Sequence, residues 1–269
     1  MKRILSLLVL VTAVLAAVSC GKKPTPAPKM LVLYYSQTGN TRTVAETIAT
    51  TLGADIVALE AENPYDGTYQ ETIERCLKER EQGTIPAIQP VDVNVADYDI
   101  IFLGYPIWFG TYAPPVAAWL NEVDLTGKKV VPFCTFGSGG LDSSVKDLKA
   151  KQPGAEVLPG YGVRAARMNA VPEEVDQFLK RNQFVEGEFV KLEEFPEQHP
   201  VSEEEAAIFD AAVKGYQMLN AQATTVASRN LPNGVEYLFT AVDRQRESQM
   251  KVYVTVIEGE DPVFTQVVR

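Results

Sequence analysis

Residues 30–41, MLVLYYSQTGNT, join a strand-length apolar run to a polar loop that opens a helix. The apolar run, residues 30–36, suits a strand that is buried on both faces of a sheet. The segment 41–53 then repeats large apolar residues every four positions and ends in a glycine, which predicts a helix with one apolar face. The repeated residues are Val44, Ile48 and Leu52.

The alternation of strand and helix continues to about residue 183. Further strands are predicted at 54–60, 99–105, 129–135 and about 156–163. Helices are predicted at 69–81, with Ile73 and Leu77 facing inward, at 115–123, at about 141–151, and at 172–181, with Val175, Phe178 and Leu179 on the apolar side. Five strands with intervening helices predict an α/β fold with a doubly wound, five-stranded parallel sheet.

Ligands of such sheets bind beyond the carboxyl ends of the strands, so the loops at those ends are the candidate site. After the first strand, residues 36–41 bring three hydroxyls, side-chain amides and a glycine to a helix N-terminus, which is a cradle for an anion. The loop has no lysine, and neither a Walker sequence nor GxGxxG is present. A neutral cradle suits one phosphate monoester, although a helix cap without ligand explains the same residues.

Two further loops follow the third and fourth predicted strands. Residues 104–112, GYPIWFGTY, combine four aromatic rings with two glycines, and exposed rings favour a stacking partner. Residues 135–140, TFGSGG, form a flexible loop at the same edge of the sheet. The alternative is that the rings pack on one another or under a second domain.

Together these loops resemble the flavodoxin family. Residues 35–41 are similar to its phosphate loop, S/T-x-T-G-x-T, and residues 104–110 resemble the loop beside the flavin in the G-x-P-I-W-W-G subgroup. Tyr69, Arg75 and Glu79, and the stretch 127–129, also fall where that subgroup has similar residues. The resemblance covers about 30–183, and it implies noncovalent FMN binding and electron transfer.

The resemblance assigns a role to each loop. Residues 36–41 would hold the FMN phosphate, Trp108 would flank the isoalloxazine ring, backbone groups of 109–111 would approach flavin N5 and O4, and 135–140 would support the other side. Close relatives often have His-Gly-Gly in the third loop where this chain has Phe-Gly-Ser, so no side chain is assigned as an acid or base. The expected FMN-binding residues are Ser36, Gln37, Thr38, Gly39, Asn40, Thr41, Pro106, Ile107, Trp108, Phe109, Gly110, Thr135, Phe136, Gly137, Ser138 and Gly139.

The N-terminal residues have the pattern of a targeting segment. Residues 1–20 have two basic residues, an apolar run and the ending Ala-Val-Ser-Cys, which resembles a bacterial lipoprotein signal. The resemblance implies removal of residues 1–19, a diacylglycerol on Cys20 and a lipid anchor on the outer side of a bacterial cell membrane. An uncleaved anchor or a conventional secretory signal is the alternative. The Pro-rich stretch 20–29 is expected to be an extended tether.

A second domain is expected after a linker at 184–201. Ser202 and Glu205 predict a helix N-terminus with a capping box, in a helix that runs to about Ala221. Strands are predicted at 224–230, 235–243, 249–257 and 263–268, with a turn at 232–234. One helix before four antiparallel strands resembles the cystatin-like α+β fold for 202–269. Inhibitory cystatins carry Q-x-V-x-G and this chain keeps only Gly234, so a recognition or dimerisation role is expected instead of protease inhibition.

Composition excludes other classes of function. The chain has 269 residues and a formal net charge of −10, so a nucleic-acid partner is not expected. Cys76, Cys134 and His199 are too few for a zinc cluster, and His199 lies in a Pro-flanked connector, where it is expected to be solvated. Cys76 and Cys134 are expected at separate buried positions, and their pairing stays open.

Two functions remain. The favoured one is an exported, membrane-tethered FMN protein that passes electrons between an unidentified donor and a small-molecule or protein acceptor. The rival is a binding protein whose flavodoxin-like domain holds no cofactor and whose C-terminal domain binds a partner.

Overall fold

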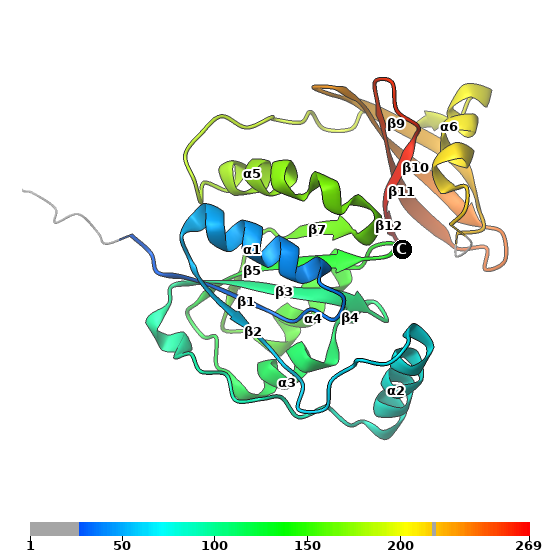
Figure 1. The fold of residues 1–269 in the computed structure, drawn as a ribbon. Helices are drawn as coiled ribbons and strands as arrows, with labels where there is room; N and C mark the ends of the chain where they lie inside the picture. Colours follow the sequence, from blue (N-terminus) through cyan, green and yellow to red (C-terminus); the bar gives the residue numbers. More distant parts are fainter. Residues whose placement is uncertain (1–26, 217–218) are drawn as a thin grey trace, which may run out of the picture.

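The computed structural model describes residues 27–216 and 219–269, which form two sheets with separate cores (Figure 1). The predicted signal at 1–19, Cys20 and most of the tether lie outside the described residues. No helix of the described part is long and apolar enough to cross a membrane.

The N-terminal domain is a parallel sheet in the order β2-β1-β3-β5-β6, with β7 also paired to β5. The predicted doubly wound α/β fold is therefore confirmed. The fifth predicted strand is wrong in one respect: it forms two short strands separated by 158–160. Leu158 N still donates to the Val130 carbonyl at 2.9 Å, but a Cβ on Gly160 would lie 2.7 Å from the Pro132 carbonyl oxygen, so the chain passes β5 there too closely for regular pairing. The strands are β1 (Met30–Tyr34), β2 (Asp55–Ala58), β3 (Ile100–Trp108), β5 (Lys129–Phe136), β6 (Glu156–Val157) and β7 (Tyr161–Arg164).

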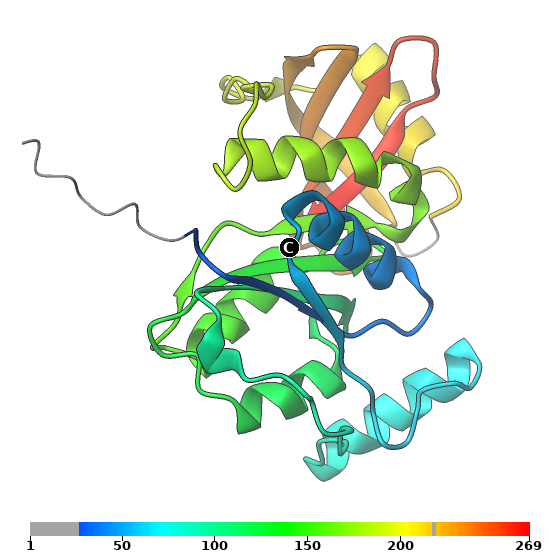
Figure 2. The ribbon, with the colours of Figure 1, turned by 60° about the vertical axis from the view of Figure 1, so that its left-hand side comes forward.

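Helices cover both faces of this sheet (Figure 2). On one face α1 (Asn40–Leu52) and α5 (Val171–Arg181) share a core with β1, β3 and β5. On the other face α3 (Pro114–Glu122) and α4 (Leu141–Lys151) pack on the same strands. Short 3₁₀ turns at Val95–Asp97 and Ala165–Ala170 complete the connections.

Helix α2 (Tyr69–Gln82) lies to one side of the sheet, and its predicted inward face is wrong. The helix buries Thr72 and Cys76, while the side chain of Leu77 is 49% exposed and Ile73 is partly buried. The physical reason is the helix's neighbour. Helix α2 packs on a loop instead of on a broad sheet face. In that loop Gln37 Nε2 donates a hydrogen bond to the Thr72 hydroxyl at 3.0 Å.

The C-terminal domain is an antiparallel sheet in the order β12-β11-β10-β9-β8 with one helix against it. Helix α6 (Glu203–Val213) has the predicted capping box at Ser202, and Phe209 packs on Phe239 with ring centroids 5.2 Å apart. The helix ends well before Ala221, because Gly215 at φ 85° turns the chain and Ala221 already begins a strand. The strands are β8 (His199–Pro200), β9 (Ala221–Leu231), β10 (Gly234–Asp243), β11 (Gln249–Ile257) and β12 (Val263–Val268).

The predicted linker 184–201 is divided between the domains: Phe184 and Val185 pack on the N-terminal core, and the part from Glu193 onward packs on the sheet face opposite α6. Gln198 Nε2 donates to the Leu238 carbonyl at 2.8 Å, and its Oε1 accepts from the hydroxyls of Thr225 and Thr240 at 2.9 and 2.7 Å. Phe195 covers Tyr253 nearby. The end of the linker is therefore a strap on the C-terminal domain.

We expect Gln198→Leu to destabilise the C-terminal domain by about 1–3 kcal/mol, because it leaves a carbonyl and two hydroxyls without partners. Urea unfolding followed by circular dichroism measures the change. The neighbouring exposed Glu197→Gln is the control and should stay within about 0.5 kcal/mol of the parent. Equal stability of the two variants would mean that the strap does not form in solution.

Candidate functional site

The three predicted loops meet at one edge of the N-terminal sheet. They follow β1, β3 and β5, which are adjacent and parallel, so their carboxyl ends lie side by side. Thr41 and Thr135 share a buried hydrogen bond of 2.9 Å between their hydroxyls, which joins the first loop to the third. A Cβ on Gly140 would lie 2.6 Å from Ile107 Cγ2, so the second and third loops are also in close contact.

The first loop leaves the N-terminus of α1 without a side-chain cap. Gly39 occupies the N-cap position at φ 93°, and the first helical turn has no acidic residue. The Gly39 amide donates to Ser36 Oγ at 3.2 Å, which holds the loop around the helix end. Uncapped amides and the helix dipole together attract an anion.

Two of the predicted phosphate-loop side chains have other partners. The Gln37 amide donates to the Tyr65 carbonyl at 2.7 Å and to Thr72, so it is directed toward α2. Thr41 is buried against Thr135. The donors that remain at the loop surface are the backbone amides with Ser36, Thr38 and Asn40, of which Thr38 is exposed.

The second loop is a hairpin, with β3 continuing to Trp108 and pairing with β4 (Thr111–Tyr112). Its two turn residues, Phe109 and Gly110, have φ of 50° and 86°, as a two-residue turn of type I′ requires. The positive φ at Phe109 costs about 1 kcal/mol or more for a residue with a side chain. That side chain is 46% exposed. Pro106 and Ile107, predicted in a loop, are the last strand residues before Trp108.

Trp108 is held in an aromatic bracket that the sequence did not predict. Its ring centroid lies 5.9 Å from that of Tyr35 and 5.1 Å from that of Tyr65, both edge to face. The Arg75 guanidinium lies 3.7 Å from the Tyr65 centroid and pairs with Glu79 at 2.8 Å. Arg75 and Glu79, which the family resemblance pointed out, therefore support Trp108 through Tyr65. In the sequence Tyr65 is only an aromatic residue after a turn, so no pattern predicted its place in the site.

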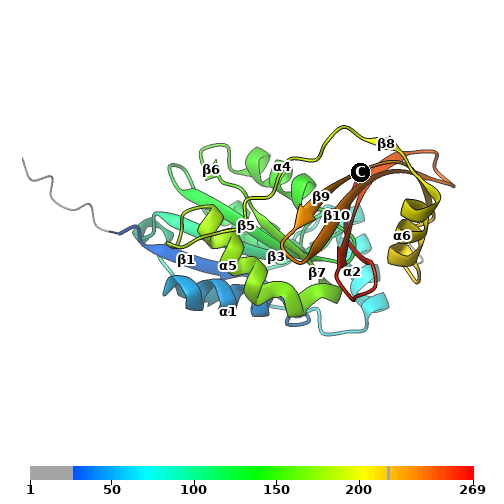
Figure 3. The same ribbon diagram turned by 90° about the horizontal axis from the view of Figure 1, so that it is seen from above.

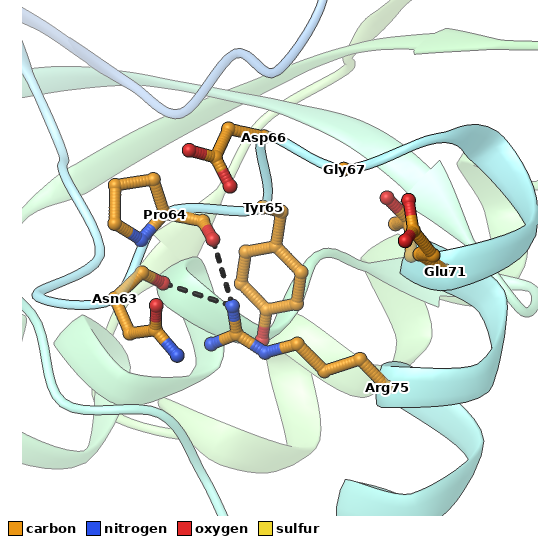
Figure 4. A pocket seen from close by; sticks show the side chains of 8 residues that line it. Asn63, Pro64, Tyr65, Asp66, Gly67, Glu71 and Arg75 are labelled. Atoms are coloured by element: carbon orange, nitrogen blue, oxygen red, sulfur yellow. Dashed lines mark hydrogen bonds between the residues drawn. The ribbon is translucent and has the colours of Figure 1, made fainter.

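Two members of this bracket, Tyr65 and Arg75, also line a shallow pocket of about 340 Å³ (Figure 4). Arg75 Nη1 donates to the carbonyls of Asn63 and Pro64 at 3.0 and 2.8 Å, which fixes the loop after β2. Burial is the main cause that raises the pKa of the Tyr65 hydroxyl, and its 2.7 Å hydrogen bond to Glu79 raises it further. Tyr65 thus stays protonated in neutral solution. The full lining is Asn63, Pro64, Tyr65, Asp66, Gly67, Glu71, Thr72 and Arg75.

Thr111, at the base of the hairpin, was expected to offer only its backbone, and its side chain adds a second feature. Within the described residues its hydroxyl oxygen is buried and has no hydrogen-bond partner. An unsatisfied buried hydroxyl is costly, so this atom is a donor and acceptor available to a ligand.

The third loop is divided between core and surface. Thr135 and Phe136 are buried, and a Cβ on Gly162 would lie 2.8 Å from the Phe136 ring, so this ring belongs to the core. Gly137, Ser138 and Gly139 continue at the edge of the sheet. The carbonyls of Gly137 and Ser138 accept hydrogen bonds from Arg164 Nε at 2.8 Å and from the Val267 amide at 2.6 Å.

The described residues contain no cluster of His, Cys, Asp and Glu arranged for a metal ion. Cys76 and Cys134 are both buried and both free thiols. Burial is the main cause that raises the pKa of Cys76 to about 11. His199 is exposed, and its Nε2 lies 3.5 Å from Glu205 Oε1, away from the three loops.

Comparison with known proteins was consistent with this geometry. The sequence profile of the family described as Flavodoxin matches residues 29–178. A candidate flavoprotein from Bacteroides uniformis is 25% identical with a TM-score of 0.50, over 55% of this chain and 98% of its own. One from Bacteroides eggerthii is 29% identical with a TM-score of 0.49, over 56% of this chain and 97% of its own.

A flavoprotein from Lactobacillus acidophilus, solved in complex with FMN, is 25% identical with a TM-score of 0.47, over 51% of this chain and 93% of its own. These solved relatives cover about half of this chain, whereas the family profile alone spans more than half of it. The strand order and the meeting of the three loops agree with that match. Through residues 29–178 this chain belongs to the flavodoxin family, to which it adds a C-terminal antiparallel-sheet domain.

Proposed function

We propose that this protein binds FMN noncovalently at the three loops and transfers electrons through it between a donor and a small-molecule or protein acceptor. The observation that carries the proposal is the meeting of an uncapped helix N-terminus, the Trp108 hairpin and the third loop at one sheet edge. Membership of the flavodoxin family supports it.

The first loop fits the phosphate of FMN. The site offers backbone amides and hydroxyls without a lysine, and the first turn of α1 has no carboxylate to repel an anion. One phosphate monoester needs only such neutral donors and the helix dipole. In this role Ser36, Thr38 and Asn40 bind the phosphate, while Gln37 and Thr41 hold the loop in shape.

The second loop fits an aromatic ring with polar edges. Trp108 offers a ring that Tyr35 and Tyr65 hold in place, and the unpartnered Thr111 hydroxyl offers a hydrogen bond beside it. When bound, FMN supplies one- and two-electron redox chemistry at its ring. The residues of this chain orient the ring and shield it from water, and no side chain is assigned a proton-transfer role.

The ends of the chain extend the proposal. We infer that residues 1–19 are a lipoprotein signal and that Cys20 carries a lipid that anchors the protein on the outer side of a bacterial cell membrane. One capped helix against an antiparallel sheet also supports a cystatin-like fold for 202–269. That domain then serves in recognition of a redox partner or in dimerisation.

FMN binding is measured by titrating the flavin with purified protein, residues 21–269, and following flavin fluorescence. We expect strong quenching with micromolar or better affinity, because stacking on an aromatic ring quenches the flavin. Unchanged fluorescence at high protein concentration would instead support the rival function, in which the domain binds a partner without FMN.

Trp108→Ala should weaken FMN binding by about 1–3 kcal/mol, the scale of base–aromatic stacking in nucleotide sites. Phe189→Ala is the matched control, since it removes a ring that is 41% exposed in the linker, away from the three loops. The same titration compares the two variants. Equal affinities would remove Trp108 from the flavin site.

Asn40→Asp tests the phosphate contact separately from the contact with the flavin ring. A carboxylate in the first turn favours helix α1, yet it repels a phosphate bound there, by about 1–2 kcal/mol. We therefore expect roughly tenfold weaker FMN binding and unchanged binding of riboflavin, which lacks the phosphate. The exposed Asn121→Asp in α3 makes the same charge change elsewhere and should alter neither affinity. An equal loss for both flavins would move the phosphate away from α1.

A further inference from the structure

The C-terminal domain touches the N-terminal domain at the third loop of the candidate site. It lies beside the carboxyl ends of β5 and β7, the edge to which that loop belongs (Figure 3). Strand β12 is at the edge of its sheet, and its Val267 amide points away from β11 to donate to the Ser138 carbonyl at 2.6 Å. The third loop thus hydrogen-bonds to the free edge of β12.

The loop is shaped for this contact. Gly139 has φ 157°, and a Cβ at that position would overlap the Val267 carbonyl oxygen. The backbones of loop and strand therefore approach more closely than a side chain allows. A close backbone approach of this kind requires glycine at position 139.

Arg164, the last residue of β7, joins the two domains a second time. Its Nε donates to the Gly137 carbonyl at 2.8 Å, and its Nη1 donates to the Phe264 carbonyl at 2.7 Å. The guanidinium also lies 4.3 Å from the centroid of the Phe264 ring. Burial lowers the pKa of Arg164, as expected for a cation enclosed between two domains.

Tyr216 brings a hydroxyl from the C-terminal domain to the same loop. Its ring packs on Phe264 with centroids 5.2 Å apart, and the Arg164 guanidinium lies 5.3 Å from it. A Cβ built on Gly137 would lie 4.0 Å from the Tyr216 hydroxyl. The third loop itself has Phe136 turned into the core and glycines around Ser138, so it offers few polar side chains of its own.

We propose that the C-terminal domain is part of the FMN site: Arg164 positions the third loop, and Tyr216 supplies the phenol hydroxyl that contacts the flavin on that side. The inference rests on the proposed function. It means that the second domain shapes the cofactor site directly, whatever else it recognises.

Two variants of the soluble protein, residues 21–269, which contains both described domains, test the proposal. Arg164→Met keeps most of the apolar stem and removes the bonds to both carbonyls, whereas Tyr216→Phe keeps the ring packing and removes only the hydroxyl. The matched controls are Arg229→Met and Tyr253→Phe. Arg229 pairs with Glu236, donates to the Glu193 carbonyl and lies over the Phe195 ring, and Tyr253 packs on that ring, all on the sheet face under the linker.

Flavin titration gives the dissociation constant for FMN, and thermal unfolding of the FMN-free variants gives their stability. We expect at least tenfold weaker binding for Arg164→Met and at least threefold for Tyr216→Phe, with both controls within twofold of the parent. Tyr216→Phe should also unfold at the parent's temperature, which a merely structural role of its hydroxyl does not predict.

Hydrogen–deuterium exchange of the FMN-free protein adds a readout that needs no cofactor. Arg164→Met should speed exchange at residues 137–141 and at Val267, and Arg229→Met should not. FMN affinity within twofold of the parent for either Arg164→Met or Tyr216→Phe overturns the inference. Absence of FMN binding by the parent protein is a different result, because it overturns the proposed function itself.

Discussion

A single buried hydrogen bond, between the hydroxyls of Thr41 and Thr135, sits where the candidate site comes together. Both side chains are almost fully buried, so neither hydroxyl has water to replace the other. Each one costs free energy unless it is paired, and the pair can form only when α1 starts directly beside the end of β5. The register of the parallel sheet and the position of the helix are thereby tied together at the edge where ligands of such folds bind.

Three features that lower the stability of the fold locally lie around this bond. The N-terminus of α1 has no side-chain cap, Phe109 adopts a positive φ, and the Thr111 hydroxyl is buried without a partner in the described residues. Each feature is unfavourable in an isolated fold, and all three lie at the same sheet edge. Strain and unpaired polar groups concentrated at one place are typical of a binding site. Here they coincide with the site that we propose for FMN.

The third loop shows why the second domain matters to the first. Its backbone is bonded on one side by Arg164 and on the other by the edge of the C-terminal sheet. A loop rich in glycine is flexible by itself, and these bonds restrict it. Residues 186–269, which are most of the linker together with the C-terminal domain, hold 15 acidic and 7 basic residues, yet the contact of this domain with the loop is made through backbone groups and aromatic rings, which do not depend on that charge.

Local patterns in the sequence were enough to predict the α/β class, the capping box at Ser202, the longer strands of both sheets to within a few residues, and the three loops of the site, because apolar periodicity and turn residues are local signals; the two-residue strands β4 and β8 were not predicted. Tertiary structure decided the rest. It turned the buried face of α2 to Thr72 and Cys76, divided the last parallel strand, and placed Tyr65 behind Trp108. It also brought Tyr216 and Val267 to the loop at 137–139. These contacts join residues far apart in the chain, and no local pattern encodes which distant surfaces meet, since that depends on how whole elements pack.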